Sequence, residues 1–369
     1  MVQVSIITPM RNAGEFLDEA ARSGTSQTLP SSRTAHCSLT AACATRPVLA
    51  QSYEGQIEWC VYDDGSTDGS AAILEGHRGA LQARGIRLRV VSSPEGAPAG
   101  GCGLGRNKLV EVCLGDHLCF FDADDVMRPG RVRAQLDLAQ AHPGAIVGSR
   151  FVREPADATP RWTAWLNGMT QEQLRSQFLR ECTLAMPTWM MHRRVFDAVG
   201  GFDGGSANNA EDLKFFYAHV ARGGELVRAD EELLVYRFHS CSVTGQRGVP
   251  WELIWGLRVE ALEKQVLGEP PWSGGFTIWG AGKEGKRLYR SLCKESRAKV
   301  VAFCDVDERK IAHGVYEHME SGRRVPIVHF RDARPPLLLC VKGGLTGGEF
   351  EDNVESLGLK EGAEFLHFS

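Results

Sequence analysis

The sequence of 369 residues has no long apolar run, no excess of charge of one sign and no closely paired cysteines. A membrane-spanning helix needs about 18 or more consecutive apolar residues, and no segment approaches that length. The formal net charge of -4 argues against broad attraction to nucleic acid or to a membrane surface. The first residues, MVQVSIITPM, lack the basic and long apolar regions of a secretory signal and predict a first β-strand.

The eleven cysteines are scattered along the chain without a C-x-x-C pair. Zinc sites and thioredoxin-type redox sites therefore have no support. Several cysteines lie inside apolar, strand-like runs such as CFFDADD, AFCDVD and LLLCVK. Buried free thiols in a reducing compartment explain this usage best, and we expect a cytoplasmic protein.

Apolar strand-like runs alternate with helix-like segments in the first half of the chain. The predicted strands are 4–10, 57–64, 86–93 and 116–125, and the predicted helices are 13–23, 69–85, 105–115 and 128–143. This alternation predicts an α/β fold with a doubly wound, mainly parallel sheet covered by helices on both faces. Polar residues are then expected to collect at the carboxyl ends of the strands.

A Pro- and Gly-rich segment, GEPPWSGG, predicts a domain boundary after a long helix. We expect a first domain over 1–247, a helix and linker over 248–274, and a small Rossmann-like α/β domain over 275–369. In this last part, Gly280, Gly282 and Gly285 form a G-x-G-x-x-G turn between a strand and a helix, and Asp305 ends the next strand. That context is typical of a dinucleotide site, although about 95 residues are few for a complete one. A functional NAD site and a vestigial, structural turn both stay open.

The segment 24–47 interrupts what otherwise reads as one helix. It has no hydrophobic periodicity and is rich in Ser, Thr and Ala. Removing it joins its flanks as EAARSVLAQSYEG, a continuous helical pattern. Because such a composition offers little apolar surface to offset the entropy of ordering, we expect an inserted, disordered loop.

Acidic residues occur at three element boundaries of the first domain. They are Asp63 and Asp64, then Asp122, Asp124 and Asp125, and finally Glu211 and Asp212. Carboxylates at the end of a strand can hold a divalent metal, and a D-x-D in extended backbone sends both side chains to one side. A single such group is more often a solvated turn or a helix cap. Three groups in one α/β half favour a functional site.

Five segments resemble the successive motifs of the family-2 inverting glycosyltransferases. They are VSIITPMRNAGEFLDEA, VYDDGSTDGS, GRNKLVEVCLGDHLCFFDADDVMRPGRV, GGFD followed by NAEDLKFF, and VYRFHSCSVT. They follow the family's order from about Val4 to about Thr244. The resemblance implies the GT-A fold of nucleotide-diphospho-sugar transferases. It also implies transfer of a sugar from a UDP-sugar, with UDP-GlcNAc as one candidate, to an acceptor hydroxyl with inversion.

The resemblance also implies which residues bind the donor. Pro9 falls where the family contacts the nucleotide base, and Asp63 or Asp64 would bind the uracil or the ribose. Arg106 falls where the family often contacts the diphosphate, although the usual Ala-Arg-Asn reads Gly-Arg-Asn here. Asp122 would contact the ribose.

The remaining implied roles concern the metal and the base. Asp124 would hold a Mn²⁺ or Mg²⁺ ion that bridges the diphosphate. His239 falls where these enzymes often place a late metal ligand, but a structural or acceptor-binding histidine is equally compatible. Asp212 would be the catalytic base. Two alternatives stay open, namely a non-catalytic nucleotide-sugar-binding scaffold and an NAD-dependent activity of the C-terminal part.

Overall fold

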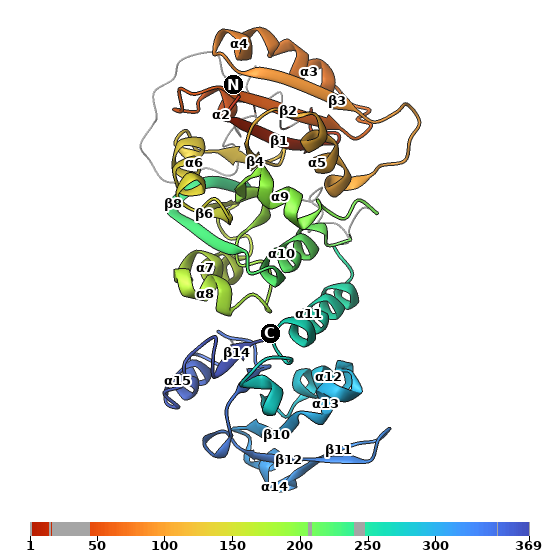
Figure 1. Cartoon of the computed structure of the whole chain (residues 1–369), viewed down its shortest axis with the longest axis vertical. Coiled ribbons are helices and arrows are strands. Elements are labelled where there is room, and N and C mark those ends of the chain that lie inside the picture. The colour runs from red at the N-terminus through yellow and green to blue at the C-terminus, as the bar shows by residue number, and fades with distance from the viewer. Residues whose placement is uncertain are drawn as a thin grey trace, which may run out of the picture. The chain divides into compact units, whose positions relative to one another are not determined.

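The computed structural model describes residues 2–14, 16, 45–205, 209–239, 248–344 and 346–368 (Figure 1). The chain forms two compact units. Unit 1 consists of Met1–Gly168 and Leu184–Val249, and unit 2 consists of Met169–Thr183 and Pro250–Ser369. Unit 2 thus contains a short segment from the middle of the chain that nothing in the sequence distinguishes. Most of the expected insertion, 24–44, lies outside the described residues, and its last three residues begin helix α2 (Thr45–Leu49).

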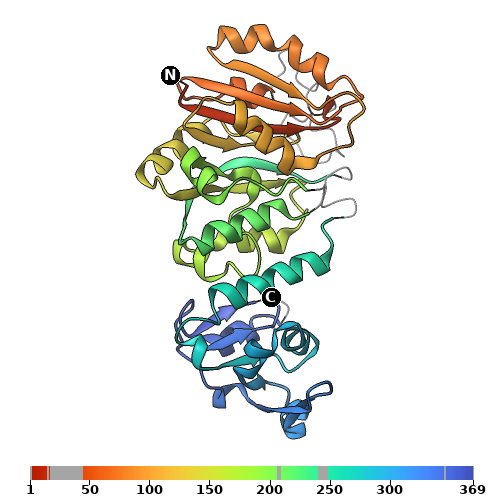
Figure 2. The same ribbon diagram turned by 45° about the vertical axis from the view of Figure 1, so that its right-hand side comes forward.

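Unit 1 is built on one mixed sheet, in which the described strands follow the order β3-β2-β1-β4-β7-β6-β8-β5. The strands are β1 (Val4–Met10), β2 (Ile57–Asp63), β3 (Arg87–Ser92), β4 (His117–Phe120), β5 (Val126–Met127), β6 (Ala145–Glu154), β7 (Met190–His192) and β8 (Glu225–Arg237). The strands β3, β2, β1 and β4 are parallel to their neighbours in this series, whereas β7 and β5 run antiparallel to theirs. Figure 2 shows β1 in red beside β2 in orange. The prediction of a parallel-rich α/β sheet is confirmed.

Helices of unit 1 connect these strands. They are α3 (Ser70–Gly76), α4 (Arg78–Ala83), α5 (Gly101–Val112), α6 (Arg131–Ala141), α7 (Pro160–Gly168), α9 (Arg193–Val199) and α10 (Glu211–Ala221). Helix α5 packs on β1 and β2, and α6 packs on β6, β7 and β8 (Figure 1). The single helix expected over 69–85 is wrong, because the chain leaves the helix at His77. Gly76 and Gly79, which have low helix propensity, lie on either side of this break.

The strand register brings the predicted donor residues to one edge of the sheet. Met10 at the end of β1 lies opposite Asp63 at the end of β2. On the other side of β1, Ile7 lies opposite Phe120, the last residue of β4. Because the three strands are parallel, the residues that follow them emerge at the same carboxyl edge. The fully buried and mainly apolar strands β1, β2 and β4 therefore hold the polar loops in place.

Aromatic packing fixes the start of α10. Phe202, in the loop before the helix, stacks on Phe215 with ring centroids 4.7 Å apart, and Phe196 of α9 lies 5.8 Å from both rings. The ring of Trp189 also packs on Phe215, with the centroids 5.9 Å apart. Buried aromatic pairs of this kind contribute packing beyond the area that they bury. Glu211 and Asp212 therefore project from a rigid helix end.

Unit 2 contains a second α/β sheet, whose described strands follow the order β11-β12-β10-β9-β13-β14. The strands are β9 (Phe276–Trp279), β10 (Val300–Asp305), β11 (Val315–His318), β12 (Arg323–His329), β13 (Leu337–Leu339) and β14 (Phe365–His367). The helices are α8 (Gln171–Ser176), α11 (Trp251–Gln265), α12 (Lys283–Ser291), α13 (Lys294–Ala298), α14 (Glu308–His313) and α15 (Glu349–Glu355). All neighbours except β11 and β12 are parallel.

The apolar side chains of unit 2 form their own core. Trp279, Phe330 and Phe350 pack together at its centre, with ring centroids of Trp279 5.1 Å and 5.4 Å from the other two. Cys304 of β10 is fully buried in the same cluster. All eight cysteines in the described ranges carry free thiols. Among the described helices, none is long and apolar enough to span a membrane.

Candidate active site

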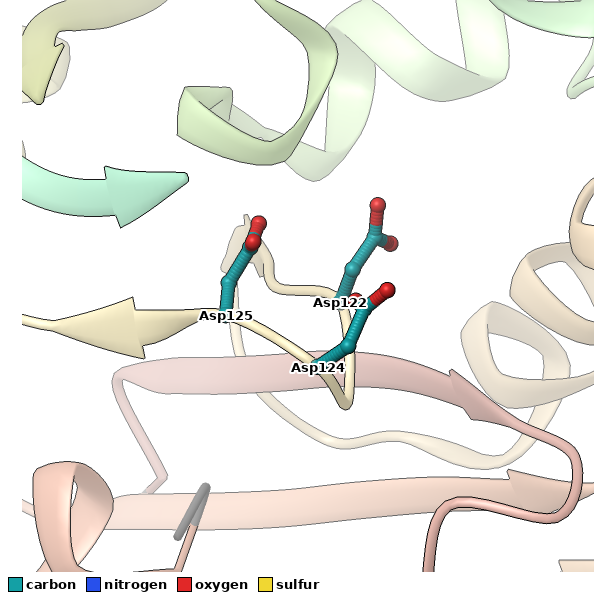
Figure 3. A group of neighbouring side chains, drawn as sticks. All are labelled: Asp122, Asp124 and Asp125. Atoms are coloured by element: carbon teal, nitrogen blue, oxygen red, sulfur yellow. The ribbon is translucent and has the colours of Figure 1, made fainter. Parts of the chain in front are cut away.

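An acidic turn follows β4 at the carboxyl edge of the unit 1 sheet. The strand ends at Phe120, and the backbone N–H of Asp125 donates to the carbonyl of Asp122 at 3.2 Å. The expectation of an extended D-x-D is therefore wrong, because this hydrogen bond closes a turn. The turn still brings the carboxylates together: one oxygen each from Asp122, Asp124 and Asp125 lie within 4.8 Å of one another. Figure 3 shows the three side chains leaving the turn toward the same side.

The structure joins the two residues that the resemblance implies as metal ligands. Nε2 of His239, just beyond the end of β8, lies 2.9 Å from Oδ2 of Asp124. The imidazole also packs on the ring of Phe16, with the centroids 4.6 Å apart. Both side chains keep part of their surface exposed, 22% for His239 and 32% for Asp124. The pair is therefore accessible to a ligand. The two residues are 115 positions apart in the sequence.

Asp125 also belongs to the site, although the sequence alone predicted no role for it. It is 1% exposed, and its Oδ1 accepts a hydrogen bond from the backbone N–H of Arg237 at 2.9 Å. Among the described residues, its Oδ2 has no hydrogen-bond partner. Burial, followed by the charges of Asp124 and Asp122, raises the pKa of this carboxyl well above its ordinary value. An unsatisfied buried oxygen beside two other carboxylates is a favourable position for a bound cation.

Arg106 of α5 lies beneath this group and links it to α10. Its guanidinium donates from Nη2 to Asp122 Oδ1 at 2.8 Å and from Nη1 to Glu211 Oε1 at 3.0 Å. The side chain is only 4% exposed. Burial lowers the pKa of Arg106, but Asp122, Cys102 and Glu211 more than offset this effect, so that its pKa is raised. Arg106 is thus a buried, charged bridge between two groups of acidic residues.

Asp122 lies near both positively and negatively charged side chains. Burial raises the pKa of Asp122 above its ordinary value, the nearby Arg106 lowers it, and Asp124 raises it again. The side chain remains 25% exposed, so it can reach a ligand while it accepts from Arg106. Repulsion between Asp122 and Asp124 would be relieved by a positive ion between them.

The two aspartates after β2 hold different backbone segments. Asp64 accepts from the backbone N–H groups of Gly100 and Gly101, each at 3.0 Å, with one oxygen for each. Asp63 accepts from the N–H of Ser66 at 2.8 Å. Both residues are buried, with exposed fractions of 6% for Asp63 and 7% for Asp64. Asp64 therefore fixes the start of α5, and Asp63 fixes its own turn.

Gly105 of α5 lies close to the sheet, beside Tyr62 and Pro9. A Cβ atom added at Gly105 would lie 2.8 Å from Cδ1 of Tyr62 and 3.4 Å from Cβ of Pro9. A larger residue would push α5 away from β1 and β2, and Arg106 would move with it. This contact gives a physical reason for glycine where the family usually has alanine.

The start of α10 carries the predicted base. Ala210 precedes the helix in a left-handed conformation, with φ of 56°, and Glu211 and Asp212 occupy the first turn. Glu211 contacts Arg106, whereas Asp212 Oδ1 accepts from the backbone N–H of Leu213 at 2.8 Å. Asp212 is partly exposed. The first turn of a helix is a favourable place for carboxylates, because the helix N-terminus carries a partial positive charge.

The donor set suits a hard divalent cation. Carboxylate oxygens from Asp122, Asp124 and Asp125 with an adjacent imidazole are typical ligands of Mn²⁺, and the oxygens also suit Mg²⁺. The unpartnered Oδ2 of Asp125 and the mutual proximity of the three carboxylates are the observations that fit such an ion.

Comparisons with known proteins find relatives in sequence and in fold. The sequence profile described as glycosyl transferase family 2 matches residues 5–200. TuaG of Bacillus subtilis (strain 168), assigned as a glycosyltransferase of teichuronic acid biosynthesis, is 25% identical over 287 residues, which cover 77% of this chain and 97% of TuaG.

Solved structures of S. aureus TarS show the same fold. TarS 1-349 in complex with UDP-GlcNAc matches with a TM-score of 0.53 at 15% identity, over 80% of this chain and 71% of that one. The same fragment in complex with UDP matches with a TM-score of 0.50 at 15% identity, over 80% and 70%. The family 2 profile covers Arg106 and the acidic turn, whereas Glu211, Asp212 and His239 lie beyond its last residue. Because the profile matches more than half of the residues, the chain belongs to glycosyl transferase family 2.

Proposed function

We propose that unit 1 transfers a sugar from a UDP-sugar to an acceptor hydroxyl with inversion at the anomeric carbon, and that UDP-GlcNAc is the first donor to test. The observation that carries this proposal is the convergence of Asp122, Asp124 and Asp125 at the carboxyl edge of the sheet. TarS, which has a related fold, has been solved with UDP-GlcNAc and with UDP. The acceptor is a hydroxyl-bearing molecule of unassigned class.

The nucleoside would lie at the ends of β1 and β2. Pro9 lies beneath α5 at the end of β1 and would support the base. Among the described residues, both oxygens of Asp64 accept backbone N–H groups, whereas Asp63 accepts one through Oδ1. Asp63 therefore has the freer carboxylate, and we assign it to hydrogen bonding with the uracil or the ribose. Asp122 would contact the ribose from the other side.

Asp124 and His239 would hold a Mn²⁺ or Mg²⁺ ion, with Asp125 completing the acidic group. When bound, such an ion neutralises the charge that develops on the leaving nucleoside diphosphate. Arg106 holds Asp122 and Glu211 in place, since it hydrogen-bonds both. We therefore assign Arg106 a positioning role for the acidic turn, in addition to the diphosphate contact that the resemblance implies.

Asp212 would be the general base. Its partly exposed carboxylate would accept the proton of the acceptor hydroxyl as that oxygen forms a bond to the anomeric carbon. The bond from the anomeric carbon to the diphosphate oxygen breaks in the same displacement, and UDP leaves with the electron pair. One base is sufficient for this single displacement, which inverts the configuration.

The metal-dependent donor site is tested with Asp124→Asn. Calorimetric titration with UDP in the presence of Mn²⁺ should show at least about tenfold weaker binding than the unchanged protein, since a ligand carboxylate loses its charge. Asp197→Asn, at an exposed position of α9, is the matched control and should bind normally. If Asp124→Asn binds UDP with unchanged affinity in Mn²⁺ and in EDTA, the proposed donor site is wrong.

A further inference from the structure

A cavity of about 420 Å³ opens in unit 2 at the carboxyl ends of β9, β10 and β13. The parallel strands run in the order β12-β10-β9-β13-β14, so the chain leaves β9 on one side and returns to its other side at β13. Open α/β sheets bind ligands at this change of direction. The cavity volume is also within the range of small-molecule sites. It lies entirely among described residues of unit 2 and is separate from the acidic turn.

The glycine turn forms one wall of this cavity. Gly280 has a φ of 115°, a conformation that favours glycine. A Cβ atom added at Gly285 would lie 1.9 Å from the carbonyl oxygen of Gly280, so α12 and the turn are in direct contact. Gly282, which precedes α12, has no side chain to cap the first backbone N–H groups of the helix. These N–H groups are suited to an anion such as a phosphate.

Asp305 has a different role from the one that a dinucleotide site would give it. Its Oδ2 accepts from Ala281 N at 2.9 Å and from Lys310 Nζ at 3.0 Å. Its Oδ1 accepts from the backbone N–H groups of Val306 and Asp307, both at 3.0 Å. Four donors occupy the capacity of one carboxylate, so Asp305 is not available to bind the hydroxyls of a ribose.

These contacts bring a cation to the glycine turn. Nζ of Lys310 lies 3.8 Å from the position that a Cβ atom would take at Gly282. Lys283 and Lys342 also line the cavity, as do the carboxylates of Glu284 and Glu349. The lysine held by Asp305 therefore faces the same space as the N–H groups of α12. Together they provide a charge-assisted site for one phosphate group.

Apolar side chains line another part of the cavity. Val306 is 51% exposed directly after the end of β10, and Val341 follows β13. The rings of Trp279 and Phe350 form the inner wall. An exposed valine beside aromatic residues is suited to the flat, weakly polar face of a nucleobase.

We propose that the unit 2 cavity binds a nucleoside phosphate of mononucleotide size, with its phosphate at the glycine turn and its base against Val306. The second half of the sheet supports the size limit, since β13 and β14 have three residues each. A dinucleotide needs two complete mononucleotide halves and a free acidic residue for the ribose. This site is independent of the proposed transferase function of unit 1.

The test uses the full chain carrying Asp124→Asn, which removes the proposed metal-dependent binding in unit 1. Calorimetric titrations with UMP, UDP, AMP, ADP and NADH are made in EDTA. At least one of the four mononucleotides should bind with a stoichiometry of one and more tightly than NADH. Adding Gly282→Leu, which places a side chain in the cavity without backbone strain, should weaken that binding by at least about tenfold.

Gly268→Leu is the matched control because Gly268 is exposed in unit 2 and its added Cβ would meet open space. It should bind the mononucleotide normally. Lys310→Gln, which removes the cation, provides a second test if Gly282→Leu lowers Tm, and it should weaken binding while the protein remains folded. The proposal is overturned if none of the four mononucleotides binds at about 1 mM, if NADH binds more tightly than all of them, or if Gly282→Leu and Lys310→Gln both retain full binding.

Discussion

The two units carry different polar groups at the same edge of an α/β sheet, namely the carboxyl ends of its parallel strands. In unit 1, the loops at the carboxyl ends of parallel strands carry carboxylates and a histidine, with Arg106 buried beneath them. In unit 2, the corresponding edge carries a glycine turn, three lysines that line the cavity, and Asp305, whose carboxylate is fully hydrogen-bonded; Glu284 and Glu349 also line this cavity. An acidic edge can receive a phosphate only with a cation, whereas backbone N–H groups and lysine can receive it directly.

The carboxylates of the two edges differ in how fully hydrogen bonds and neighbouring cations compensate their charge. Asp125 is buried with an unpartnered oxygen and has a raised pKa, because burial and two neighbouring aspartates oppose its charge. Asp305 accepts four hydrogen bonds and serves the architecture of its turn. Incomplete compensation of buried charge is a feature of functional sites, so the contrast indicates which acidic group is built for a ligand.

The largest expected effect separates binding from chemistry within unit 1. Asp212→Asn keeps the shape of the side chain but removes proton acceptance, so turnover should fall by about 10²–10⁴-fold. Binding of UDP with Mn²⁺ should be unchanged. A transfer assay at saturating donor, run beside a UDP titration, measures both quantities.

Glu211→Gln is the matched control for Asp212→Asn, because it alters the adjacent residue and retains an acceptor for Arg106. Its effect on turnover should be much smaller. Near-normal turnover in Asp212→Asn would remove Asp212 as the base and favour a non-catalytic binding protein.

Arg106→Ala tests the charged bridge on which the acidic edge depends. Removing one partner of a buried ion pair leaves uncompensated charge and lowers the free energy of unfolding by about 3–5 kcal/mol. Lys108→Ala, on the same helix, removes an exposed pair with Glu111 and should lower it by at most about 1 kcal/mol. Urea denaturation of both variants gives the comparison. Equal, small losses would show that Arg106 does not support the site.

Gly282→Leu tests whether the two edges act independently. We expect sugar transfer by unit 1 to stay within about twofold of the unchanged protein, which is less than 0.5 kcal/mol in the activation barrier. The measurement is the transfer rate at saturating donor, with Tm as a check on folding. A large loss of transfer in a folded variant would show that the glycine turn and the acidic turn are coupled.

The smallest effect is expected from deletion of residues 24–44, which spares α2. This segment has few large apolar side chains to bury, so its removal should change Tm by no more than a few degrees. The deletion variant should also bind UDP with Mn²⁺ normally. A large fall in either quantity would contradict the interpretation of this segment as an insertion.

The parts of the fold that depend on local pattern could be predicted from the sequence. Continuous apolar runs identified β1, β2 and β4, and the acidic residues after them marked the edge at which they meet. The bridge from Arg106 to Glu211 could not be predicted, because its residues are 105 positions apart and either could be an ordinary surface group. Asp305 shows the same limit: its position fitted a ribose-binding residue, and only its four hydrogen bonds reveal another role.

The membership of residues 169–183 in unit 2 has a consequence for how the protein is made. Glu361 accepts hydrogen bonds from Gln173 at 3.1 Å and from Ser176 at 2.8 Å, and Gln173 is separated from Glu361 by 188 positions. During translation this segment, including the apolar and fully buried Leu174, therefore leaves the ribosome long before Glu361 has been synthesised. All of unit 1 can therefore be synthesised while residues 169–183 still lack the rest of unit 2. A gene fragment that stops after residue 249 would encode this segment without the residues that it packs against.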